Sequence, residues 1–164
     1  MSSNNLALVF SDWHVHDFSS FDKNGSRLEY CMKVLEDIGD YCKANSIEVI
    51  LFSGDLYHNG KSIPTKVVNA VMLGFYKFFE RHPEIRFYAI SGDHDFATLN
   101  TNKEAGVSAL RHIADTYPRN FILVDNKVVR INKDVEVGGV PYYEFKAMYE
   151  AVSYTHLRAH ETTS

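Results

Sequence analysis

Acidic and imidazole side chains follow three apolar runs of the sequence at the same relative position. Asp12 follows the run LALVFS, Asp55 follows VILFSG and Asp93 follows YAISG. His14 lies two residues beyond the first aspartate, and His94 directly follows the last. Carboxylate oxygens with imidazole nitrogens suit Mn²⁺, Fe²⁺ or Zn²⁺ better than Ca²⁺, which prefers oxygen ligands alone. The spacing therefore predicts a divalent metal site.

The three apolar runs must bring these residues together if such a site exists. Leu6–Phe10, Glu48–Phe52 and Arg86–Ile90 are short and largely apolar, which is typical of parallel strands buried on both faces. Ligands of parallel sheets bind at the shared carboxyl edge of the strands. Carboxylates gathered there repel one another and raise each other's pKa values unless a cation lies among them. One aspartate after a strand is usually a turn residue, but three such endings favour the metal site.

Two helices are expected between these strands. The first begins at a capping box formed by Ser26 and Glu29, and its apolar stripe extends from Leu28 to Cys42. The second has Pro64 in its first turn and an apolar stripe from Val67 to Phe79. Alternating strands and helices predict an α/β fold with a parallel core and right-handed crossovers.

The second half of the sequence predicts one short helix and more strands. The helix is expected over Lys103–Asp115, before Pro118. The runs FILV, KVVRI and DVEVGGV, which cover 121–124, 127–131 and 134–140, predict strands that extend the sheet or begin a second layer.

Composition and charge exclude several classes of protein. With 164 residues and 45% hydrophobic content, the chain is long enough for one domain with a core. A net charge of −4 argues against a strongly basic nucleic-acid-binding surface, although it permits a local patch. No apolar run reaches the roughly 18 residues of a membrane span, and no signal peptide is recognisable. Cys31 and Cys42 lie about 16 Å apart along one helix, so we expect reduced thiols in a cytoplasmic protein.

Three motifs resemble those of the calcineurin-like metallophosphoesterase superfamily. They are the Asp-x-His of Asp12–His14, the Gly-Asp of Gly54–Asp55 and the Gly-Asp-His-Asp of Gly92–Asp95. The stretches SDWH, GDLYH and VGGVPYY are most similar to the nuclease component of the double-strand-break repair complex, which is an exonuclease in bacteria and has archaeal, eukaryotic and phage counterparts. The resemblance covers Leu6 to Glu144. It implies a metal-dependent exonuclease or endonuclease that cleaves DNA phosphodiesters in repair or recombination.

The resemblance also implies cofactors, partners and residue roles. It implies two divalent metal ions, with Mn²⁺ as the first choice and Fe²⁺ or Zn²⁺ as alternatives. The implied site residues are the metal ligands Asp12, His14, Asp55 and Asp93 and the catalytic pair His94 and Asp95. Asp55 would bridge both ions, and His94, steadied by Asp95, would act on the scissile phosphate as a proton donor. DNA, an ATPase subunit of the structural-maintenance type and a second copy of the chain are the implied partners.

The sequence departs from the family pattern in two places. The family has Asn where this chain has Asp93, which adds a negative charge and should tighten metal binding. The family also has three later histidines, whereas this chain has only His156 and His160 beyond the predicted helices, at a different spacing. Residues 151–164 resemble a translated sequencing adaptor. We therefore expect 1–150 to be the N-terminal part of a metallophosphoesterase domain, with an incomplete second half, and 151–164 to be an artefactual or disordered tail.

Other functions remain open from the sequence. A small-nucleotide phosphodiesterase or a phosphatase of the same superfamily would share the motifs, and a non-catalytic scaffold would share the fold. The stretch GDLYH disfavours the phosphoprotein phosphatases, which have an Asp-Arg-Gly turn there. His16 is expected to be a solvated loop residue. His58 is expected either to help place the substrate or to serve only in the loop.

Overall fold

The computed structural model is an α/β structure built on a parallel sheet, and it describes residues 7–96, apart from 19, 23 and 25, and residues 108–142. Four parallel strands lie side by side in chain order: β1 (Leu8–Phe10), β2 (Val49–Phe52), β3 (Arg86–Ala89) and β4 (Phe121–Leu123). In the described part of the chain, the α-helices between these strands are α1 (Arg27–Ala44), α2 (Thr65–Arg81) and α3 (Arg111–Thr116), and a short 3-10 helix covers Asp93–Asp95. The predicted fold class is confirmed.

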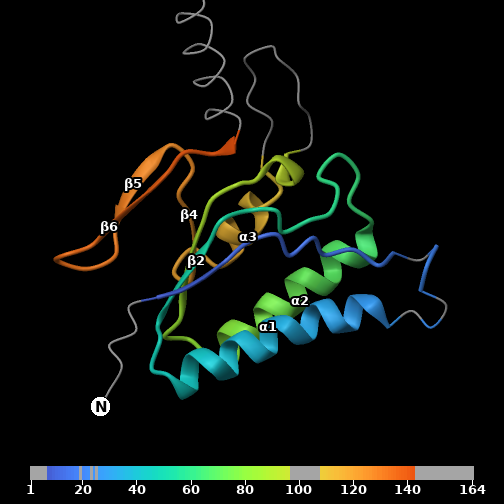
Figure 1. The fold of residues 1–164 in the computed structure, drawn as a ribbon, viewed down its shortest axis with the longest axis horizontal. Coiled ribbons are helices and arrows are strands. Elements are labelled where there is room, and N and C mark those ends of the chain that lie inside the picture. The colour runs from blue at the N-terminus through green and yellow to red at the C-terminus, as the bar shows by residue number, and fades with distance from the viewer. Residues whose placement is uncertain (1–6, 19, 23, 25, 97–107, 143–164) are drawn as a thin grey trace, which may run out of the picture.

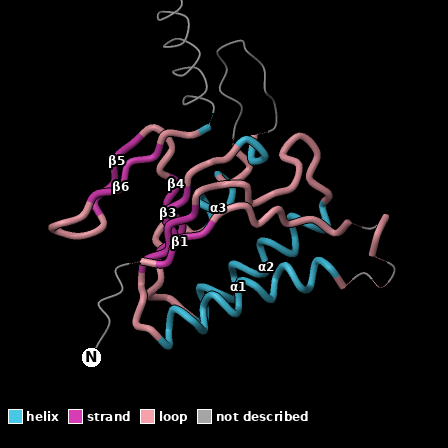
Figure 2. Tube along the Cα trace, viewed as in Figure 1, coloured by secondary structure: helices cyan, strands magenta, loops and turns pink. Residues whose placement is uncertain are grey.

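Helices α1 and α2 lie next to each other along one face of the sheet (Figures 1 and 2). Right-handed crossovers between strands that follow one another in the sheet place both helices on the same face. The core between the layers is aromatic: the ring of Phe75 on α2 lies 5.5 Å from Phe87 on β3 and 5.3 Å from Phe121 on β4. No helix within the described ranges is long and apolar enough to cross a membrane.

The later β-rich segments do not all join this sheet. The run FILV becomes β4, the fourth parallel strand. Strands β5 (Lys127–Arg130) and β6 (Glu136–Gly139) pair with each other in an antiparallel hairpin, and Gly139 also forms an isolated parallel bridge with Asp125. The parallel sheet therefore grows by one strand, and the next two strands form a separate two-stranded sheet.

Two predictions about the helices are wrong in detail. Ser26 precedes α1, but its backbone is already helical (φ −88°, ψ −15°) and its side chain caps nothing. The carboxylate of Asp22 instead accepts the backbone N–H of Arg27 at 2.6 Å. The third helix is shorter than predicted, since α3 begins only at Arg111, and residues 103–107 lie outside the described residues. Ser108 pairs with Phe96 in an antiparallel bridge, which excludes it from the helix.

Both cysteines are free thiols, as expected. Cys42 is fully buried in the core, and that burial raises its pKa to about 11.

Candidate metal centre

The loops after β1 and β2 continue side by side beyond the edge of the sheet. The backbone N–H of Asp12 donates to the carbonyl of Gly54 at 3.0 Å, and that of His14 donates to the carbonyl of Asp55 at 2.9 Å. Parallel pairing therefore persists after the strands end, and it holds three predicted site residues at the carboxyl edge of the sheet.

The three residues at this edge have an unusual backbone conformation. Asp12, His14 and Asp55 have φ values of 56°, 49° and 61°, in the left-handed region that residues with a Cβ rarely adopt. Each such residue costs about 1–2 kcal/mol relative to an ordinary conformation. Backbone strain of this kind concentrates at functional sites, where the surrounding structure enforces it. Its clustering here supports a functional role for this edge.

The two glycines that precede the aspartates allow two loops to touch. Gly54 has a φ of 97°, and a Cβ on it would clash with the backbone of Gly92. A Cβ on Gly92 would in turn overlap the carboxylate of Asp55. The glycines thus make room for the Asp55 side chain between the loops after β2 and β3.

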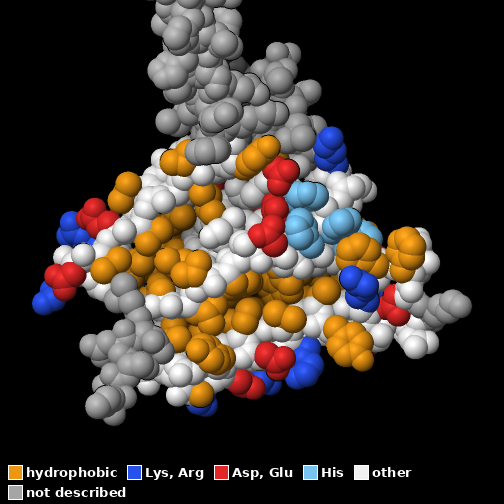
Figure 3. All heavy atoms as spheres, viewed as in Figure 1, with side chains coloured by type: hydrophobic (Ala, Val, Ile, Leu, Met, Phe, Trp, Pro, Cys, Tyr) orange, Lys and Arg blue, Asp and Glu red, His pale blue; other side chains and the backbone are white. Residues whose placement is uncertain are grey.

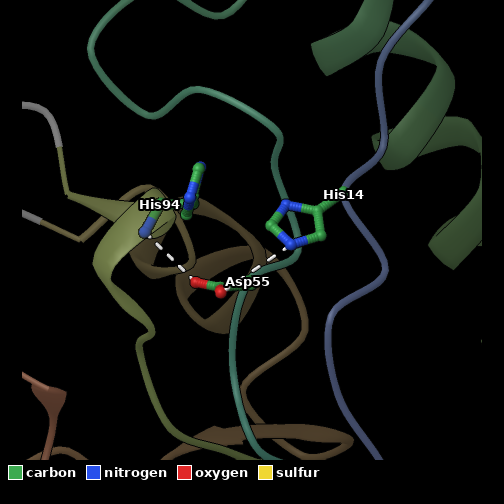
Figure 4. A group of neighbouring side chains, drawn as sticks. All are labelled: His14, Asp55 and His94. Carbon is green, nitrogen blue, oxygen red and sulfur yellow. Dashed lines mark hydrogen bonds and ion pairs between the residues drawn. The ribbon is translucent and has the colours of Figure 1, made fainter.

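Asp55, His14 and His94 form the centre of the site (Figure 4). Oδ2 of Asp55 lies 3.9 Å from Nε2 of His14, and Oδ1 accepts the backbone N–H of His94 at 3.1 Å. One potential metal-binding atom from each of the three side chains lies within 4.8 Å of the other two. Burial raises the pKa of the Asp55 carboxyl, and the nearby carboxylate of Asp93 raises it further.

Asp12 and Asp93 border this triad. Oδ1 of Asp12 lies 3.7 Å from Nε2 of His14, and its side chain is 67% exposed, compared with 17% for Asp55. Asp93 is near enough to influence the pKa values of both Asp55 and His94. Figure 3 shows carboxylates and histidines adjacent on this face of the molecule. The structure thus brings the five residues to one edge but places only three within shared reach of a single ion.

His94 is steadied by a residue other than the one expected. Its Nδ1 lies 2.6 Å from the backbone carbonyl oxygen of His58, so Nδ1 is the protonated nitrogen that donates to this acceptor. This hydrogen bond raises the pKa of His94, and the carboxylates of Asp93 and Asp55 add to the rise. The loop of GDLYH therefore orients His94 through its backbone.

Asp95 instead joins the loops of the site. Its carboxylate is completely buried and accepts three backbone N–H groups, from Asp55 at 2.8 Å, Gly92 at 3.0 Å and Tyr57 at 3.2 Å. Burial raises the pKa of Asp95 to about 6, although these three hydrogen bonds oppose the shift. The predicted contact with the His94 ring is replaced by a structural role.

A second, partly buried network supports the same loop, and the sequence analysis missed it. The hydroxyl of Ser91 donates to Oδ2 of Asp125 at 2.6 Å, and its backbone N–H donates to Oδ1 at 2.8 Å. Ser91 also contacts the hydroxyl of Ser108 at 2.6 Å. The signal was present, because the run FILV is a fourth apolar run with an aspartate directly after it.

The amino-acid sequence was compared with those of known protein families. The model of the calcineurin-like phosphoesterase family matches residues 7–158, which include every residue of the candidate centre. Proteins of this family typically bind divalent metal ions. A search of curated proteins found no significant match.

We predict that Asp95→Asn destabilises the protein and lowers its activity together. The amide group would place N–H donors against backbone N–H groups, leaving at least one of them unsatisfied, which costs roughly 1–3 kcal/mol. Chemical denaturation should measure the loss of stability. Asp37→Asn on the exposed surface of α1 is the matched control and should change the free energy of unfolding by less than about 0.5 kcal/mol. Equal effects of the two substitutions would contradict the role of Asp95.

Proposed function

The chain belongs to the calcineurin-like phosphoesterase family, and from this premise we propose that it is a metal-dependent nuclease that hydrolyses DNA phosphodiesters. Membership makes it a hydrolase of phosphoric esters, and the parallel sheet with its flanking helices is consistent with part of the family's fold. The observation that carries the proposal is the meeting of His14, Asp55 and His94 at the carboxyl edge of the sheet. The stretches SDWH, GDLYH and VGGVPYY support a nuclease within the family.

The residues of the centre fit divalent metal ions. Nδ1 of His14 is buried without a hydrogen-bond partner among the described residues, while its Nε2 faces two carboxylates. The partly buried carboxyl of Asp55 has a raised pKa, and a cation beside it would favour its charged form. Asp12, His14, Asp55 and Asp93 would hold these ions, with Asp55 as the carboxylate that they would share. Such ions would polarise a phosphoryl oxygen and supply a nucleophile at neutral pH.

His94 is the proton donor of the proposed reaction. With Nδ1 fixed on the carbonyl of His58, the proton available for catalysis is the one on Nε2. The raised pKa of His94 increases the protonated fraction near neutral pH. When the phosphorus–oxygen bond breaks, the leaving oxygen would take this proton, so that it departs as an alcohol.

The wider proposal follows from the same resemblance. DNA would be the substrate, an ATPase subunit of the structural-maintenance type and a second copy of the chain would be partners, and the cytoplasm would be the location.

The role of His94 predicts a specific kinetic effect. His94→Asn should lower kcat by roughly 10²–10⁴-fold, the usual contribution of a general acid, while metal content stays close to that of the wild type. Activity against a phosphodiester and metal content measured by inductively coupled plasma analysis provide the two readouts. A loss of bound metal in this variant would make His94 a ligand and would contradict its role as proton donor.

The nuclease proposal predicts which substrates the full chain hydrolyses. With Mn²⁺, it should release nucleotides from linear DNA, and excess EDTA should abolish that release. A cyclic mononucleotide, bis(p-nitrophenyl) phosphate and a phosphate monoester are the comparison substrates. Hydrolysis of the cyclic mononucleotide without any cleavage of DNA would replace the nuclease by a small-nucleotide phosphodiesterase. Absence of all metal-dependent hydrolysis would favour the scaffold.

Asp93→Asn restores the residue that the family has at this position. Removing one negative charge should weaken metal binding moderately and leave the bound ions more electrophilic, so activity at saturating Mn²⁺ should be maintained or increased. Activity measured as a function of Mn²⁺ concentration separates the two effects. A large loss of activity at saturating metal would be evidence against the assignment of this residue.

A further inference from the structure

Ring contacts continue outward from His94 of the candidate metal centre to the loop that precedes α1. The ring of His58 lies 6.1 Å from that of His94, and the ring of Phe18 lies 4.8 Å beyond it. The guanidinium of Arg27 lies over the Phe18 ring at 4.5 Å from its centroid, a cation–π contact. Side chains therefore form an uninterrupted path from the centre to a cation at the start of α1.

The same loop exposes a second aromatic ring. The side chain of Phe21 is 85% exposed, and its backbone N–H donates to the carbonyl of Phe18 at 2.8 Å, so both rings belong to one turn. Phe18 itself has a φ of 45°, an unusual conformation for a bulky residue, and its N–H donates to Nδ1 of His16 at 2.8 Å. The turn thus holds one ring under Arg27 and presents the other to solvent. Figure 3 shows hydrophobic and cationic side chains beside the histidine cluster.

The position of these rings beside a polar centre favours a role in ligand binding over a role in core packing. Large hydrophobic side chains that stay exposed next to a catalytic centre commonly mark binding surfaces. Nucleobases stack on aromatic rings and on guanidinium planes, and phosphates pair with arginine. Bases inside a duplex already have both faces stacked, whereas an unpaired nucleotide can turn a free face toward an aromatic ring.

We propose that Phe18, Phe21 and Arg27, here called the ring platform, bind an unpaired nucleotide of the DNA strand that leads to the scissile phosphate. The base stacks on Phe21 and on the guanidinium plane of Arg27, which Phe18 supports from below. The guanidinium edge pairs with a phosphate of the same strand. This inference rests on the proposed nuclease function, because the strand that leads into the metal centre is the one that reaches the platform. It assigns the centre a preference for single-stranded or frayed DNA ends.

Direct binding tests the platform without requiring catalysis. Fluorescence anisotropy of a labelled oligothymidylate is measured with the full chain in excess EDTA, which prevents cleavage. Phe21→Ala and Arg27→Ala should each weaken binding by roughly 5- to 100-fold, corresponding to the loss of one stacked base. Phe21→Trp should retain the affinity of the wild type, since a larger ring replaces the first. Tyr41→Ala, which removes another exposed ring from α1, is the matched control and should change the Kd by less than twofold.

Two further measurements separate stacking from charge. Arg27→Ala should reduce the dependence of log Kd on log salt by about 0.7, the contribution of one phosphate of a single strand, whereas Phe21→Ala should leave that dependence unchanged. An oligonucleotide that lacks bases should bind the wild type and Phe21→Ala with equal affinity. Equal losses on base-free and normal oligonucleotides would overturn the platform, and so would a wild-type affinity for Phe21→Ala.

The platform and the nuclease proposal fail in different ways. Metal-dependent cleavage of DNA with no effect of Phe21 or Arg27 on binding would overturn the platform alone. Weakened binding by these variants with no hydrolysis of any DNA would support the platform and overturn the nuclease proposal. Absence of any oligonucleotide binding by the wild type would overturn the platform, while hydrolysis of bis(p-nitrophenyl) phosphate would still report on the metal centre.

Discussion

The buried carboxylate of Asp95 holds together the loops on which the candidate chemistry depends. It accepts N–H groups from Asp55 and Tyr57 in the loop after β2, and from Gly92 in the loop after β3. Burying a carboxylate costs free energy unless it is fully hydrogen-bonded. Asp95 can therefore stay buried only while the two loops remain in place to donate these N–H groups. The same contact between loops positions His94. Its two hydrogen-bond partners, the carboxylate of Asp55 and the carbonyl of His58, both belong to the loop after β2.

The strained conformations around Asp55 are stable only because the sheet continues beyond its strands. Asp12 and His14 adopt positive φ angles while their N–H groups bond to the neighbouring loop. The aromatic contacts between α2 and the sheet, with Phe75 at their centre, fix the strands from which these loops emerge. The candidate metal centre is therefore coupled to the pairing of β1 with β2, and disruption of that pairing would release the strain and separate His14 from Asp55.

Sequence reasoning predicted the features that local pattern encodes. Apolar runs and helical periodicity are local, so β1, β2, β3, α1 and α2 were recognised, along with the edge where their aspartates meet. Contacts between distant segments are not encoded locally. The sequence favoured Asp95 as the partner of His94, yet the tertiary structure gives this role to the backbone carbonyl of His58. The cap of α1 was a local error, because Asp22 and not Ser26 accepts the backbone N–H of Arg27. The pairing of Ser91 with Asp125 depends on β4 lying beside β3, and the aspartate directly after the apolar run FILV was the signal that could have predicted it.

Charge balance explains why two neighbouring carboxylates have different roles. Asp95 and Asp55 are both withdrawn from water, and burial raises the pKa of each. Three backbone N–H groups surround Asp95, whereas Asp55 has one from His94 and otherwise faces the imidazole of His14. Of the two carboxylates, Asp55 is the one with an oxygen that faces another potential metal ligand, Nε2 of His14, and the charge of Asp93 lies nearby. A cation beside Asp55 would offset the charge repulsion there, as the three backbone hydrogen bonds stabilise the carboxylate of Asp95. The electrostatic environments therefore distinguish the structural carboxylate from the candidate metal ligand.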